Sequence, residues 1–224
     1  MSALHRVPQE GPRDKLIARG AMALDDAELL AVLLHTGYRD CSALDLARQL
    51  LAEFGGIGGL VRAEQSRLLA CTGIGPAKYA QLRVAVELAR RQALQTVSAG
   101  DVLSSPDATR RFLQYHLGSH NREVFCCLFL DSQHRVLRCE DLFYGTLDGA
   151  AVYPREVAVR ALQNGAAALI FAHNHPSGVA EPSVADKRIT ERLCQALSLL
   201  DIRVLDHIIV GRGGEYSFAE HGLL

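Results

Sequence analysis

Apolar residues follow two different spacings along the chain. Up to about residue 95 they recur every three or four positions, the spacing of one face of an α-helix. The segments 25–34 and 42–51 begin with Asp and Ser, which cap helix N-termini, and the segment 76–95 begins with Pro. The pattern predicts a small all-helical domain over residues 1–95.

Beyond residue 104 short apolar runs alternate with helical patterns. The runs 123–130 and 167–172 are almost continuously apolar, which is typical of central strands buried on both faces. Helices are expected at 107–116, 154–163 and 183–200, and further strands at 135–143, 202–210 and 216–218. This alternation predicts an α/β (α+β) domain over 104–224, with a mixed sheet flanked by helices.

Residues 96–103, between the two patterns, are rich in small and turn-forming residues and are predicted to be a linker. Composition adds three expectations. The net charge of −1 gives no global signal for nucleic acid, so any such contact must be local. No apolar run approaches the roughly 18 residues of a membrane span. The six cysteines form no Cys-x-x-Cys pair and indicate a reducing, cytoplasmic setting.

A possible metal site follows the apolar run 167–172. His173 and His175 are two residues apart, so on an extended strand both point to one face. With Asp186 they make three protein ligands and leave a fourth position for water, which is how catalytic zinc is held. The alternative is a polar turn followed by a helix whose N-cap is Ser183 and whose first turn contains Asp186. The two interpretations are compatible, because a capped helix start would hold Asp186 in place.

A second candidate site lies at the start of the long helix in the first half. Gly73-Ile74-Gly75 can bring backbone N–H groups close to an anion at a helix N-terminus, and Lys78 adds a positive charge. The stretch resembles the turn of helix-hairpin-helix DNA-binding domains, which contacts phosphates. The alternative is a simple connector between helices of a bundle.

The spacing His173-x-His175, seven residues, Ser183-x-x-Asp186 resembles the JAMM motif of MPN-type zinc metalloproteases. Four further stretches narrow the resemblance to the bacterial RadC family, of the UPF0758 type: Pro-Arg-Glu at 154–156, His-Asn-His-Pro-Ser-Gly at 173–178, Leu-Asp-His-Ile-Ile at 205–209 and Gly-Pro-Arg-Asp-Lys-Leu at 11–16. The likeness covers nearly the whole chain, the Gly-Ile-Gly hairpin included.

The resemblance implies roles for individual residues. His173, His175 and Asp186 would bind Zn²⁺, and Ser183 would orient the water or hold the tetrahedral intermediate. Glu123, at the start of an upstream core strand, would be the general base.

Three other residues are candidates for the same site. Glu156, at the start of a helix, is a rival to Glu123 as the general base. Asp206 and His207 lie on a later strand, where one of them could orient a ligand histidine, although a hydrogen-bonded core residue is the simpler interpretation.

These observations favour a zinc-dependent hydrolase that cleaves an amide bond in a peptide or protein. Asn174 and the Pro-Ser-Gly after His175 differ from the deubiquitinating members, so isopeptide specificity is not implied. The alternative is a DNA-associated protein of the repair type that binds through Gly73-Ile74-Gly75, with the metal domain as an adaptor. Zinc-assisted attack on a phosphodiester is a third reading, because zinc alone does not choose between acyl and phosphoryl centres.

Overall fold

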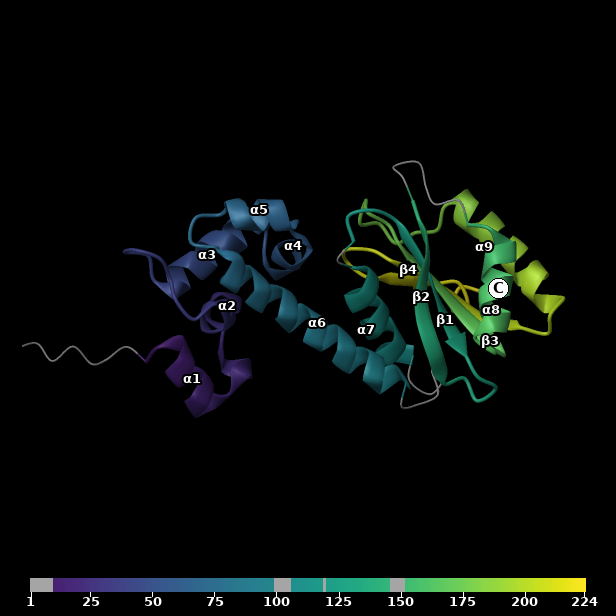
Figure 1. The fold of residues 1–224 in the computed structure, drawn as a ribbon, viewed down its shortest axis with the longest axis horizontal. Coiled ribbons are helices and arrows are strands. Elements are labelled where there is room, and N and C mark those ends of the chain that lie inside the picture. The colour runs from purple at the N-terminus through teal and green to yellow at the C-terminus, as the bar shows by residue number, and fades with distance from the viewer. Residues whose placement is uncertain (1–9, 99–105, 119, 146–151) are drawn as a thin grey trace, which may run out of the picture. The chain divides into compact units, whose positions relative to one another are not determined.

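The structure is a computed structural model that describes residues 10–98, 106–118, 120–145 and 152–224 (Figure 1). The chain divides into two compact units, one reaching to Glu87 and the other beginning at Leu88. In the described residues, no helix is both long and apolar enough to cross a membrane.

The N-terminal unit is helical, as the sequence predicts. Its elements are α1 (Pro12–Arg19), a short 3-10 turn (Ala21–Ala23), α2 (Asp26–Leu34), α3 (Ala43–Phe54), α4 (Ile57–Arg62), α5 (Gln65–Ala70) and the start of α6 (Pro76–Ser98). Its core consists of leucines that are almost completely buried, among them Leu34, Leu46, Leu50 and Leu68. The three- and four-residue spacing of these leucines is what places them on the inner faces of their helices.

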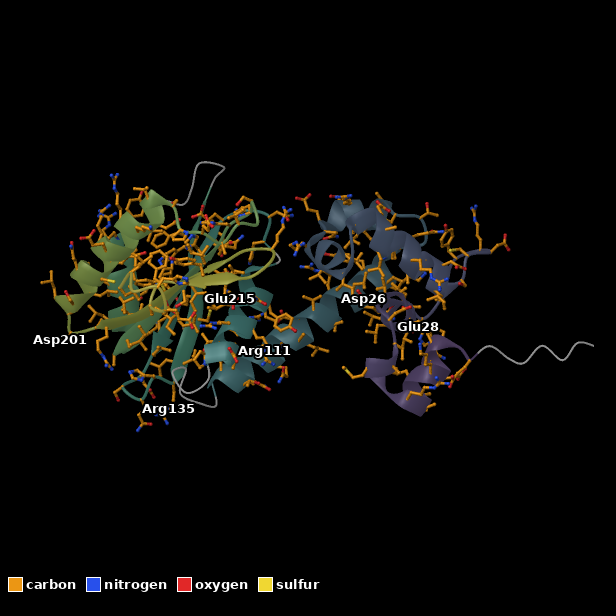
Figure 2. The ribbon with its side chains drawn as sticks, turned by 180° about the vertical axis from the view of Figure 1, so that it is seen from behind. Asp26, Glu28, Arg111, Arg135, Asp201 and Glu215 are labelled. Atoms are coloured by element: carbon orange, nitrogen blue, oxygen red, sulfur yellow. The ribbon has the colours of Figure 1, made fainter. Side chains whose placement is uncertain are left out.

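The start of α2 shows how local chemistry defines a helix end in this unit. The Asp25 side chain accepts a hydrogen bond from the Glu28 backbone, and the Glu28 side chain accepts one from the Asp25 backbone. The same Glu28 carboxylate accepts a hydrogen bond from Lys15 Nζ at 2.7 Å, which joins α1 to α2. Figure 2 labels Glu28 and its neighbour Asp26. The capping box formed by Asp25 and Glu28 satisfies two backbone N–H donors that have no partner within the helix.

Helix α6 runs further than the sequence indicates. It continues to Ser98, three residues into the predicted linker, and the remaining linker residues 99–103 lie outside the described residues. Ala93 and Val97 are buried in the same apolar cluster as Phe112 and Leu113 of α7 (Pro106–Leu117). Burial of these residues keeps the chain helical where small, turn-forming residues predicted a break. The change from one compact unit to the other, at Glu87, therefore falls within α6.

Within its described residues, the C-terminal unit is built on a five-stranded sheet. After α7 it contains β1 (Val124–Leu130), β2 (Val136–Tyr144), α8 (Pro154–Gln163), β3 (Ala168–Asn174), α9 (Val184–Ser198), β4 (Arg203–Val210) and β5 (Glu215–Ser217). The strand order is β2-β1-β3-β4-β5. β3 and β4 run parallel and the other neighbouring pairs antiparallel, which confirms the mixed sheet.

Helices cover both faces of this sheet, so β1 and β3 are buried throughout (Figure 1). On one face Cys126 and Leu128 pack with α7 and the end of α6. On the other face Phe125 and Phe171 pack with α8 and α9. Residues that alternate along a strand therefore belong to two separate cores.

Candidate metal centre

The two histidines lie where β3 ends. His173 is on the strand and buried, with 1% of its surface exposed, and His175 follows one residue after the strand. The backbone N–H of His175 donates to Val210 O at 3.0 Å, which fixes the first residue of the loop to the neighbouring strand β4. As a result the two Nε2 atoms lie 3.0 Å apart.

Asp186 reaches the same point from the first turn of α9. The Ser183 hydroxyl accepts a hydrogen bond from the Asp186 backbone at 3.1 Å and donates to Asp186 Oδ2 at 2.6 Å. The Ser183 backbone donates to the same oxygen at 2.7 Å, which completes a capping box. Ser183 and Asp186 thus form the helix cap of the structural interpretation, and this cap is what presents the carboxylate to the histidines.

The three groups have the spacing that one tetrahedral ion requires. Asp186 Oδ1 lies 3.3 Å from His173 Nε2, and Oδ2 lies 3.5 Å from His175 Nε2. With zinc–ligand bonds of about 2.0–2.2 Å, ligand atoms on the edge of a tetrahedron are about 3.3–3.6 Å apart. Both distances from the carboxylate match such an edge, and the 3.0 Å between the two Nε2 atoms is slightly shorter. Two imidazole nitrogens and one carboxylate are also an ordinary donor set for zinc, so the residues present fit the ion.

A chain of hydrogen bonds fixes which nitrogen of His173 is free. The Thr190 hydroxyl donates to the Asp186 carbonyl at 2.6 Å, so with its single proton used it must accept from His207 Nδ1, also at 2.6 Å. Neutral His207 then has an unprotonated Nε2, which accepts from His173 Nδ1 at 2.8 Å. His173 Nε2 is left without a proton and faces Asp186 and His175.

A single contact sets the orientation of the His175 ring, with Nδ1 turned away from Asp186 as in His173. Its Nδ1 donates to the Val179 carbonyl at 2.8 Å, which leaves Nε2 as the unprotonated nitrogen. Two unprotonated nitrogens 3.0 Å apart repel each other unless a cation or a proton lies between them. This pair of orphaned lone pairs, facing a carboxylate, is the strongest structural sign of a metal site.

Electrostatics within the site keep His207 neutral and Asp186 ionised. Burial lowers the pKa of His207 well below its usual value, and the neighbouring His173 lowers it further, so His207 stays neutral. Burial raises the pKa of Asp186, but the contacts with His173 and His175 outweigh burial and hold that pKa far below the ordinary range. The carboxylate is therefore ionised at neutral pH, as a metal ligand must be.

Glu123 lies beside this group and Glu156 does not share its contacts. Phe125 pairs with His173 in the antiparallel register, so Glu123, directly before β1, lies near the end of β3 that carries the histidines. Contact with Asp186 raises the pKa of His175, and the charge of Glu123 adds to that effect. Glu156 is half-exposed and pairs with Arg155 at 3.3 Å. The geometry favours Glu123 as the base, and its role stays a prediction.

Asn174 is a positioning residue that the sequence analysis did not identify. Its side-chain oxygen accepts from the Val124 backbone at 2.8 Å, and its nitrogen donates to the Arg122 carbonyl at 3.0 Å. These two bonds hold the backbone on both sides of Glu123. The available signal was an amide next to a buried apolar strand, where an unpaired amide is costly and a partner must exist.

Asp206 and His207 are successive residues of β4, so their side chains point to opposite faces of the sheet and have different contacts. His207 is fully buried and contacts His173, so it is both a hydrogen-bonded core residue and the group that orients a ligand histidine. Asp206 instead accepts hydrogen bonds from the Ser217 hydroxyl at 2.7 Å and the Ala219 backbone at 3.0 Å. Asp206 therefore fixes the end of the chain against β4.

The residues proposed for phosphate contact have other partners in the N-terminal unit. Lys78 Nζ donates to the carbonyls of Gly37 and Gly73, each at 2.9 Å. Gly73 has a φ of 89°, and a Cβ there would lie 2.3 Å from the Tyr38 ring. Close packing and backbone strain thus account for this glycine, and fold stabilisation accounts for the lysine. DNA contact by Gly73, Gly75 and Lys78 stays a prediction, and this geometry does not favour it.

Comparisons with known proteins agree with the two-unit organisation. Residues 103–223 match the family model described as RadC-like JAB domain, and residues 5–80 match UPF0758 N-terminal. The chain is 57% identical over 215 residues to a UPF0758 protein of Thioalkalivibrio sulfidiphilus, which covers 96% of each chain. It is 56% identical over 223 residues to one of Chromohalobacter salexigens, or 99% of this chain and all of that one. The chain belongs to the UPF0758 family, with a RadC-like JAB domain as its C-terminal part.

Proposed function

We propose that this protein is a zinc-dependent hydrolase of amide bonds in a peptide or protein substrate. The observation that carries the proposal is the convergence of the Nε2 atoms of His173 and His175, 3.0 Å apart, on the Asp186 carboxylate. His173, His175 and Asp186 would hold the ion. A zinc ion in such a site polarises a carbonyl and brings the pKa of bound water to about 7.

The chain's own residues divide the remaining work. Glu123 takes a proton from the attacking water and delivers it to the leaving nitrogen, as a general base and then a general acid. Asn174 holds the backbone around Glu123, and Ser183 holds the Asp186 carboxylate in its ligating position. His207 and Thr190 keep the His173 proton on Nδ1. The six cysteines, which are unpaired, are consistent with a cytoplasmic substrate.

The proposal is tested first by metal content and then by catalysis. Purified without chelator, the wild type should carry zinc that the double substitution His173→Ala/His175→Ala removes from this centre. Peptide libraries analysed by mass spectrometry then supply a cleavable substrate. With that substrate, Glu123→Gln should keep the zinc and lower kcat by about 10²–10⁴-fold.

Glu156→Gln is the matched control, because Glu156 is the rival carboxylate and pairs with Arg155. It should leave both zinc content and kcat near the wild-type values. Loss of activity in Glu156→Gln with full activity in Glu123→Gln would reverse the assignment of the base. A wild-type protein whose His173 centre takes up no added zinc would end the hydrolase proposal.

A further inference from the structure

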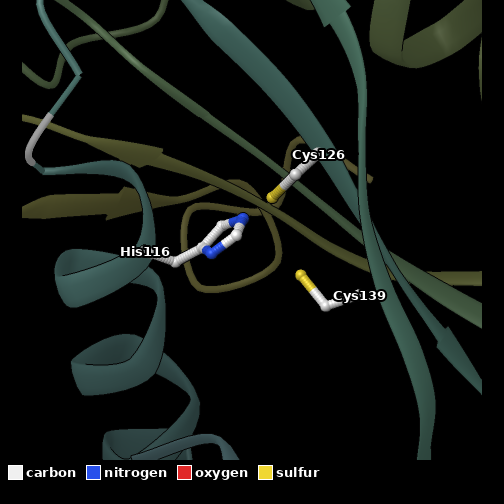
Figure 3. Close-up of side chains that lie close together, drawn as sticks. All are labelled: His116, Cys126 and Cys139. Carbon is white, nitrogen blue, oxygen red and sulfur yellow. The ribbon is translucent and has the colours of Figure 1, made fainter. Parts of the chain in front are cut away.

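Three metal-binding side chains meet in the C-terminal unit without any part in the proposed hydrolysis. They are His116 from α7, Cys126 from β1 and Cys139 from β2 (Figure 3). One ring nitrogen of the histidine and both sulfur atoms lie within 4.8 Å of one another. The three residues come from three successive elements, and packing of α7 on the β1–β2 hairpin brings them together.

Strand register separates this cluster from the centre at His173. Cys126 pairs with Asp141 across the β1–β2 ladder, and Leu128 pairs with Cys139, so these side chains share the face covered by α7. Phe125 pairs with His173 on the opposite face, under α8 and α9. The two groups of potential ligands therefore lie on opposite sides of the sheet and cannot share one ion.

His116 is held in the way that metal-binding histidines usually are. Asp141 Oδ1 lies 2.6 Å from His116 Nε2, which fixes the ring with a carboxylate. The other nitrogen, Nδ1, is buried and has no hydrogen-bond partner in the part of the chain that the structure describes, while Cys126 and then His116 lie close enough to Cys139 to lower the pKa of that thiol. A carboxylate on one nitrogen and an unpartnered second nitrogen is the arrangement of the carboxylate–histidine–metal triad.

The surroundings favour an ion that cancels the charge of two thiolates. Cys126 is completely buried, and its neighbours in this core include Phe112 and Leu117. A buried thiolate without a partner is costly, and so is a buried imidazole nitrogen without one. When Zn²⁺ binds two cysteines, each thiol releases its proton to solvent, and the two negative charges cancel the charge of the ion. A monovalent soft ion would leave a net charge in the apolar core.

We propose that His116, Cys126 and Cys139 form a second Zn²⁺ site, rich in sulfur, which ties α7 to the β1–β2 hairpin. Sulfur ligands distinguish it from the centre at His173, which offers only nitrogen and oxygen. We assign it a role in the fold, because its ligands join three elements; His116 and Cys139 are partly exposed, so a water molecule can take the fourth tetrahedral position.

The test uses the full chain with His173→Ala/His175→Ala, which removes the first centre. This variant should retain about one zinc per chain by elemental analysis. Replacement of zinc by Co²⁺ should give the sulfur-to-metal charge-transfer absorption of thiolate ligands, which a nitrogen and oxygen site does not produce. Adding Cys139→Ala or Cys126→Ala to the same background should abolish both the bound metal and the absorption.

Cys127→Ala in that background is the matched control. Cys127 is as deeply buried as its neighbour Cys126 but faces the other core, so metal and absorption should persist. Should a cysteine variant fail to fold, the background variant with both cysteines intact still decides. Absence of bound zinc and of the charge-transfer absorption there would overturn the proposal. Titration of only four thiols instead of six in the denatured, unreduced protein would indicate a Cys126–Cys139 disulfide and would overturn the proposal as well.

Discussion

At the scale of single residues, the metal centre depends on which nitrogen of each histidine carries the proton. His173 and His175 have the same side chain, yet different acceptors hold their Nδ1–H groups: His207 for the first and the Val179 carbonyl for the second. Burial lowers the pKa of His207, which keeps it neutral and able to accept. The orientation of these two candidate ligands is therefore set by residues outside the cluster of His173, His175 and Asp186.

The contact between His207 and His173 leads to a quantitative prediction. His207→Leu removes the acceptor for the His173 proton, so zinc affinity should fall by about 10–100-fold. His207→Gln offers a carbonyl oxygen in its place and should lose less. Competition with a chromophoric chelator measures both affinities.

Asp206→Asn is the control on the same strand, because Asp206 contacts Ser217 and Ala219 rather than the ligand histidines. Its zinc affinity should stay close to that of the wild type. Thermal unfolding of the zinc-free proteins separates a general packing defect from a ligand effect. Equal zinc affinity in His207→Leu and wild type would contradict the role given to His207.

At the scale of elements, the sequence patterns located helices and strands well, and tertiary contacts moved some of their ends. Helix α8 has the predicted bounds, 154–163, because Pro at its start and Asn-Gly at its end are local signals. Strand β3 continues two residues beyond the expected 172, through His173 and Asn174. Polar side chains suggested an end there, but partners on β4 and near β1 allow both residues to stay buried.

The hairpin before α6 gives a prediction at this scale. Lys78→Met deprives the Gly37 and Gly73 carbonyls of a shared donor, so the free energy of unfolding should fall by about 1–3 kcal/mol. Urea denaturation followed by circular dichroism measures this change.

Arg48→Met is the control for the loss of a positive charge in the same unit. Arg48 is exposed and has a 3.7 Å ion pair with Asp45, so its loss should change stability by no more than about 0.5 kcal/mol. If Lys78→Met proved as stable as Arg48→Met while weakening DNA binding, the DNA-contact hypothesis would gain over the structural role.

At the scale of the whole molecule, both groups of potential zinc ligands belong to the C-terminal unit. His173 and His116 lie beyond Leu88, whereas the leucine core around Leu46 belongs to the N-terminal unit. An ion that binds only the folded state stabilises the unit that contains its ligands, by about 2.7 kcal/mol when free zinc is 100-fold above its Kd.

Removal of zinc should therefore affect the two units differently. Hydrogen exchange followed by mass spectrometry should show faster exchange in β1, β3 and α9 after treatment with a chelator. Exchange in α2 and α3 should not change. A uniform increase over both units would indicate instead that they unfold together and that zinc stabilises the chain as a whole.

The amino-acid sequence alone predicts most helices and strands, the helical character of the N-terminal domain and the mixed sheet of the C-terminal one. It also points to His173, His175 and Asp186 as candidate metal ligands. These properties follow from local signals: the period of apolar residues, caps and turn residues, and two histidines on one strand face. The spacing of Ser183 and Asp186 also indicated the helix cap that presents the carboxylate.

Only the tertiary structure decided which groups surround those ligands. The Thr190–His207–His173 chain and the Asn174 contacts around Glu123 join segments that are not neighbours in sequence, and the cluster of His116 with two cysteines joins three successive elements. Their side chains meet because strand register and helix packing bring them to one face, and the partner of a buried polar group cannot be deduced from its local sequence. Alternation along β1 alone separates Cys126 from Cys127, whereas strand register and the packing of α7 decide that Cys126 meets His116.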